Sequence, residues 1–245
     1  MPTFRASPIR IGAAALIILG ILGIAIALLL SGNDDRARGE RPSGAVPSAS
    51  TGAVDSAATI DGRIAFWEAR VAANATDYSS TLALIDAYLT RVRATGDLSD
   101  ITRAETALDR ARDLAPVNDV GLTLREGFVA FTSHQFVEAR DAAQDVLQRD
   151  PGNESAVALY GDASIELGHE VAARRAYEEL EPLETAAVLL RVARLEQLTG
   201  DLEAAEATMH SAIATAETEG FPDQVAAYRL QLAELLRGEN RLDEA

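Results

Sequence analysis

Residues 154–180 read ESAVALYGDASIELGHEVAARRAYEEL, and this stretch decides the fold. In its first half, small or apolar side chains recur three or four residues apart, as on one face of a helix: Val157, Tyr160, Gly161 and Ser164. Gly168 breaks the pattern, and Ala173, Tyr177 and Leu180 then mark the inner face of a second helix. The small residues Gly161 and Ala173 allow two antiparallel helices to approach closely, with Tyr177 beside them. The stretch predicts one helix–turn–helix unit.

The same unit recurs along the chain. The alanines equivalent to Ala173 are Ala104, Ala139, Ala205 and Ala245. In chain order, and with Ala173 included, successive alanines are separated by 35, 34, 32 and 40 residues. A turn-forming sequence precedes each mark, at residues 96–98, 133–136, 168–169, 200–202 and 238–240. Pro116 and Pro151 each follow their alanine by twelve residues.

A period near 34 residues with small, small, aromatic and proline marks resembles the tetratricopeptide repeat (TPR) family, over residues 77–245. The resemblance implies an all-α, right-handed solenoid of antiparallel helix pairs. The chain departs from the family pattern by about three extra residues at the Gly96 turn and about six after Ala205. Glu126 and Glu196 also stand where the family usually has apolar residues.

Composition and charge narrow the classes of partner. The 245 residues are 48% hydrophobic but only 5% aromatic, and they include no cysteine, which excludes disulfides and thiolate metal sites. The net charge of −16 lies entirely in residues 63–245, which hold 17 arginines and 33 acids. Such a domain repels phosphate backbones, so nucleic acid is not expected as a partner, and a basic protein segment fits better. The simpler interpretation, which the sequence favours, is that the acids form a solvated outer face.

Residues 11–30 form an apolar run of twenty residues, long enough to cross a bilayer core of about 30 Å. The sequence favours an uncleaved signal anchor after a short basic tail, residues 1–10, over a cleaved signal peptide, because the run is long and no suitable cleavage site follows it. Basic residues flank both sides, so their count alone does not orient the segment. A short basic tail usually stays in the cytoplasm, and the repeats are then extracytoplasmic.

Residues 31–58 are rich in Ser, Gly, Ala and Pro and predict a disordered linker. A capping helix over 61–73, carrying Trp67, is expected next. The next helix is predicted to start at Asp77 or Ser79 and to end before the turn at 96–98. Helices are then predicted at 100–114, 119–132, 136–148, 154–166, 170–180, 184–198, 202–217 and 223–237. Residues 241–245 read as the start of another helix, so we expect the repeat domain, 59–245, to be truncated at its C-terminus.

No catalytic, cofactor-binding or metal-binding constellation stands out in the sequence, and no small-molecule substrate is evident. The three histidines, His134, His169 and His210, are interpreted as turn or surface residues. The carboxylates are mostly spaced three or four residues from arginines on helix surfaces, as in ordinary intrahelical pairs. The chain is therefore not expected to be an enzyme.

The TPR resemblance implies a partner-binding groove lined by the first helix of each pair. By position, the expected groove residues are Asp86, Thr90, Arg93, Leu124, Phe128, Phe131, Ala158, Asp162, Ile165, Leu190, Arg191, Arg194, Gln197, Leu230, Glu234 and Arg237. Phe128 and Phe131 either present an apolar patch or pack between repeats, and Arg191 and Arg194 could grip a carboxylate. Asp86 and Thr90 stand where chaperone-binding members have Lys and Asn, which argues against binding of heat-shock chaperone tails.

Three functions are consistent with these features. The first is a membrane-anchored scaffold that binds an extended segment or helix of a partner protein. The second is an assembly factor or chaperone for exported proteins. The third is the regulatory part of an enzyme whose catalytic domain lies beyond residue 245.

Overall fold

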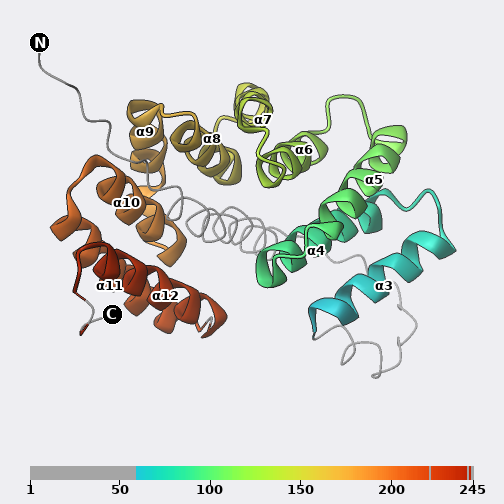
Figure 1. The fold of residues 1–245 in the computed structure, drawn as a ribbon. Helices are drawn as coiled ribbons and strands as arrows, with labels where there is room; N and C mark the ends of the chain where they lie inside the picture. Colours follow the sequence, from blue (N-terminus) through green and yellow to red (C-terminus); the bar gives the residue numbers. More distant parts are fainter. Residues whose placement is uncertain (1–58, 221, 242, 244–245) are drawn as a thin grey trace, which may run out of the picture.

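The fold is an arc of antiparallel helix pairs (Figure 1). In this computed structural model, residues 59–220, 222–241 and 243 are described. Their helices, in chain order, are α3 (Ile60–Ala73), α4 (Tyr78–Thr95), α5 (Ser99–Leu114), α6 (Val120–Thr132), α7 (Phe136–Arg149), α8 (Glu154–Glu166), α9 (Glu170–Leu180), α10 (Ala186–Thr199), α11 (Leu202–Glu219) and α12 (Pro222–Gly238). The part of the chain that the structure describes contains no strand.

Every helix predicted between residues 61 and 237 is present, with bounds within two residues of those expected. The helix start predicted at residues 241–245 lies mostly outside the described residues, and Arg241 and Asp243 are not helical. The end of α11 and the start of α10 are each shifted by two residues, and α10 was expected at Glu184 but begins at Ala186. The 3-10 turn η2 (Glu181–Leu183) precedes it, and Glu184 follows with a φ of 50°, in the left-handed region. That conformation cannot continue a right-handed helix, so α10 starts only after Thr185.

Side-chain caps fix where the first helix of each pair begins. Asp77, Asp119, Asn153 and Thr185 each accept a hydrogen bond from the backbone N–H three residues further on. A cap of this kind satisfies one of the N–H groups that an α-helix leaves without a partner at its N-terminus. The start of each repeat is therefore encoded locally.

Removing one such cap should have a measurable effect. Asn153 Oδ1 accepts a hydrogen bond from the Ala156 N–H at 3.0 Å. Asn153→Ala is expected to lower the free energy of unfolding by about 1 kcal/mol, because the α8 terminus then loses its partner. Urea denaturation followed by circular dichroism measures this, with the exposed Gln148→Ala as control. Equal midpoints for the two variants would contradict it.

The turns inside the pairs repeat one backbone geometry. His134, Gly168, Gly200 and Asn240 all have φ between 60° and 88°, and each stands five residues before the marker alanine of its repeat. In the first pair the corresponding residue is Gly96, eight residues before Ala104, which accounts for the extra length noted in the sequence. This regular left-handed position confirms the register of the repeats.

The core lies between two layers of helices. The first helices of the pairs, α4, α6, α8 and α10, line the inner side of the arc together with α12, and α5, α7, α9 and α11 lie outside them (Figure 1). The buried side chains of the described residues form three clusters, over α3–α8, α8–α10 and α10–α12, so adjacent clusters share a helix. The marker alanines Ala104, Ala139, Ala173 and Ala205 are at most 1% exposed. The regular spacing of these alanines in the sequence therefore reflects the packing of the helices.

The predicted basic tail, membrane span (11–30) and linker (31–58) lie outside the described residues. Within the described part, no helix combines the length and apolar character that crossing a bilayer requires.

Candidate functional site: the inner face of the arc

The side chains predicted to line the groove fall into three groups by exposure. Leu124, Phe128, Phe131, Asp162 and Arg191 are buried, Asp86, Arg93 and Arg194 are half-buried, and Arg237 is exposed. Phe128 and Phe131 are 1% and 3% exposed and belong to the apolar core cluster, which favours their packing role over an open apolar patch.

A buried ion pair joins the first helices of the third and fourth pairs. Arg191 of α10 donates two hydrogen bonds of 2.9 Å to the carboxylate of Asp162 on α8, from Nε to Oδ1 and from Nη2 to Oδ2. Its Nη1 donates to the Ala187 carbonyl, and the Tyr177 hydroxyl donates to Asp162 Oδ1 at 2.8 Å. Arg191 is 1% exposed. Burial of this pair is tolerated because the polar atoms have partners.

The first and second pairs are joined in the same way. Arg125 of α6 binds Asp86 of α4 through Nε and Nη2, at 2.9 and 2.6 Å, and its Nη1 donates to the Gly121 carbonyl. In both places an arginine on a first helix reaches back to an aspartate on the preceding first helix. The planar fork of a guanidinium makes two parallel hydrogen bonds to a carboxylate only when the two groups are aligned, so each pair restricts how one repeat rotates against the next.

A third ion pair lies beside the buried one. Arg194 Nη2 is 2.7 Å from Glu166 Oε1, and both side chains are largely covered. The carboxylates that Arg191 and Arg194 hold in this structure are thus Asp162 and Glu166. Whether these residues also contact a partner stays a prediction. Among the groove residues at the C-terminal end, Arg237 forms an ion pair with Glu234 of the same helix.

Arg125 and Glu166 were not identified as inner-face residues from the sequence. The sequence does contain one signal for Arg125: it lies on the first helix of the second pair, and Asp86 lies on the first helix of the first pair. The repeat pattern specifies which helices are neighbours, but it does not specify which side chains pair between them. That choice depends on side-chain orientation.

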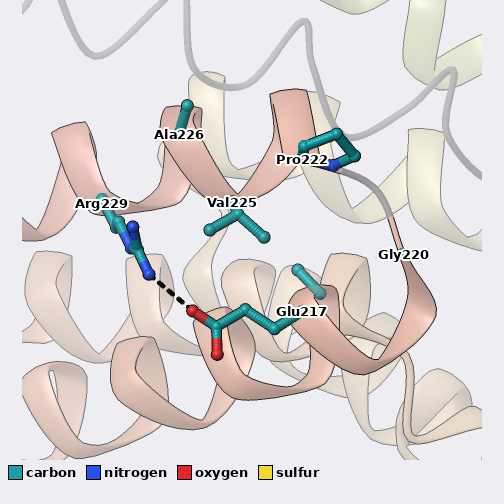
Figure 2. A pocket seen from close by; sticks show the side chains of 7 residues that line it. Glu217, Gly220, Pro222, Val225, Ala226 and Arg229 are labelled. Carbon is teal, nitrogen blue, oxygen red and sulfur yellow. Dashed lines mark hydrogen bonds and ion pairs between the residues drawn. The ribbon is translucent and has the colours of Figure 1, made fainter.

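A small pocket opens at the turn between α11 and α12 (Figure 2). It has a volume of about 370 Å³, and Ala216, Val225 and Ala226 form part of its wall. Glu217 and Arg229 meet at its mouth at 2.6 Å, with half or more of each side chain exposed. A surface pair of this kind contributes little to stability. Among the described residues, no group of three or more His, Asp or Glu side chains is arranged to hold a metal ion.

The buried tyrosines predict a loss of stability in alkali. Burial, reinforced by the Asp162 charge, raises the pKa of Tyr177 well above its usual value, and burial raises the pKa of Tyr228 to about 12. Below the unfolded pKa of about 10 both states keep the proton, so the contribution is fully present there. Above it only the unfolded state ionises, and stability falls as pH rises through the folded pKa. Urea midpoints at about pH 9 and about pH 11 should therefore differ, and Tyr177→Phe should reduce the difference. An unchanged difference in that variant would contradict the assignment to Tyr177.

Comparison with known proteins supports the repeat fold. No known protein family and no curated protein matches the sequence. Among solved structures, a TPR protein of Thermus thermophilus aligns over 89% of this chain and 98% of its own, with a TM-score of 0.54 and 16% identity. Pseudomonas aeruginosa pilF aligns over 95% of this chain and 97% of its own, with a TM-score of 0.47 and 14% identity. A chain of the APC/C hetero-tetramer Cut9–Hcn1 aligns over 90% of this chain and 49% of its own, with a TM-score of 0.45 and 18% identity. The likeness to the Thermus protein shows a TPR-like fold.

Proposed function

We propose that the chain is a scaffold whose inner face binds an extended segment or a helix of a partner protein. The observation that carries the proposal is the arc of first helices, α4, α6, α8, α10 and α12, which presents one continuous inner side (Figure 1). A TPR-like fold is a fold that commonly serves protein binding, and the fold-level analogy adds support.

The buried ion pairs support a rigid binding surface. Asp86–Arg125 and Asp162–Arg191 hold neighbouring first helices in a fixed relation before any partner arrives. A surface that is ordered in advance loses less conformational freedom on binding, which favours affinity. The proposed first contacts are two predicted groove residues of α12 whose side chains are exposed, Leu230 and Arg237.

Site-specific photo-crosslinking in the full chain tests this proposal. A crosslinking residue at Leu230, a predicted groove residue that is 60% exposed, should capture a discrete partner from membrane extracts. The matched control is Val171, 69% exposed on the outer helix α9. Capture at position 230 that is absent at position 171, and that Arg237→Glu abolishes, is the expected result. Equal capture at both positions would overturn the proposal.

We further propose that residues 11–30 anchor the scaffold in a membrane with the repeats on the extracytoplasmic side. The support is the length of the apolar run and the short basic tail before it. The full chain should stay with membranes in alkaline carbonate, whereas a chain lacking residues 11–30 should be released. Protease added outside intact cells should digest the repeats. Release of both chains would contradict the anchor, and protection of the repeats would contradict the orientation.

A further inference from the structure

A groove lies where the first helix pair meets the second. It has a volume of about 590 Å³ and lies between α5, α6 and α7. Leu108 and Val129, both buried, form part of its apolar floor, and carboxylates stand around it: Glu105, Asp109, Glu126 and Glu138. The volume falls within the range typical of ligand-binding clefts.

The next junction of the chain shows why this groove is open. Tyr160 and Leu147 are both partly buried and pack against two core clusters at once, so they close the seam between the second and third pairs. By repeat register, Glu126 lies 34 residues before Tyr160, and Arg112 lies 35 residues before Leu147. The first junction therefore has a polar pair in place of two apolar side chains. Arg112 and Glu126 meet at 2.6 Å, with 50% and 31% of their side chains exposed.

The charge around the groove is also specific to this junction. The positions equivalent to Glu105 and Glu138 at the next junction are Arg140 and Ala172. Among the described residues, neither Glu105 nor Glu138 forms an ion pair, and both are exposed. Arg112 is the single basic residue of the lining and is already held by Asp109 and Glu126. The four carboxylates and this one guanidinium leave the lining with an excess of negative charge.

We infer that this outer groove is a second docking site, for a basic segment of a partner protein in which arginine or lysine residues flank an apolar side chain. The apolar side chain enters over Leu108 and Val129, and the flanking cations meet Glu105 and Glu138. Hydrogen bonds between arginine and carboxylate are among the strong ones, and complementary charge favours this partner over an acidic one. The inference rests on the proposed scaffold function and adds a surface distinct from the inner face.

A defined probe tests the groove independently of any natural partner. The full chain is titrated with a short fluorescent peptide of alternating leucine and arginine, and anisotropy reports binding. The double variant Glu105→Gln/Glu138→Gln should weaken binding about tenfold, equivalent to about 1.4 kcal/mol. The control Glu178→Gln/Glu179→Gln removes the same charge from exposed positions on α9 and should leave binding within about twofold. Equal weakening by both variants would reduce the effect to net charge and overturn the site.

A second variant closes the groove while keeping Glu105 and Glu138 and leaving the net charge unchanged. Arg112→Leu/Glu126→Tyr installs the apolar pair of the next junction and should abolish peptide binding while keeping or raising the urea midpoint, so the loss cannot come from unfolding. Retained binding in this variant would overturn the proposal.

The other possible occupants give different outcomes. Tighter peptide binding after Arg36, Arg38 and Arg41 are changed to Gln would assign the groove to these arginines of the chain itself instead. Self-association that Glu105→Gln/Glu138→Gln abolishes would assign it to a second copy. Because the probe is a defined peptide, the groove and the inner face can fail separately: the inner-face variant Arg237→Glu should leave peptide binding unchanged.

Discussion

Replacing Arg191 with methionine is expected to lower the free energy of unfolding by about 3–5 kcal/mol. The loss arises because Asp162 stays buried with a single remaining side-chain partner, the Tyr177 hydroxyl. Both hydrogen bonds from the guanidinium disappear, and a carboxylate without its countercharge is costly to bury. The effect should exceed that of any exposed arginine in the domain. Urea denaturation followed by circular dichroism measures it.

Two further variants separate this explanation from a general loss of packing. Arg175→Met removes an exposed arginine from α9 and should shift the midpoint little. Asp162→Leu combined with Arg191→Met removes both charges and should recover most of the lost stability, because breaking a buried pair is worse than replacing it. A double variant no more stable than Arg191→Met alone would show that the uncompensated charge is not the cause.

The fold followed from local signals. The spacing of the small residues specified the register, and the left-handed turn at Gly168 recurs at the same offset in every repeat after the first. Polar residues such as Asn153 and Asp119 specified the helix starts through short-range hydrogen bonds. These signals act over three or four residues, so they can be read without knowledge of the tertiary structure.

The inner face was predicted less completely because its chemistry is non-local. Asp162 and Arg191 are 29 residues apart, and each alone suggests a charge available to a partner. Their pairing depends on how two first helices pack together. The departure at Glu126 was visible in the sequence, but its consequence, a groove beside Arg112, required the position of the neighbouring helix α5.

Gly161→Val is expected to destabilise the protein by about 1–3 kcal/mol, by overpacking the contact between α8 and α9. A Cβ at Gly161 would lie 2.5 Å from Tyr177 Cε1 and 3.2 Å from Ala176 Cβ. Tyr177 cannot move aside freely, because it is 3% exposed and its hydroxyl is bonded to Asp162. The sign of the change in stability is informative, because replacing a glycine in a helix interior otherwise stabilises a protein by about 0.5–1 kcal/mol.

Urea midpoints test this expectation against a matched glycine. A Cβ at Gly152 would have no atom within 4 Å, so Gly152→Ala should leave the midpoint almost unchanged. Gly161→Ala should fall between the parent and Gly161→Val, because one methyl group already enters the space of the Tyr177 ring. Adding Tyr177→Leu to Gly161→Val should relieve the clash, so the two changes together should destabilise less than the sum of their separate effects. Strict additivity would show that the Tyr177 ring is not what excludes a side chain at position 161.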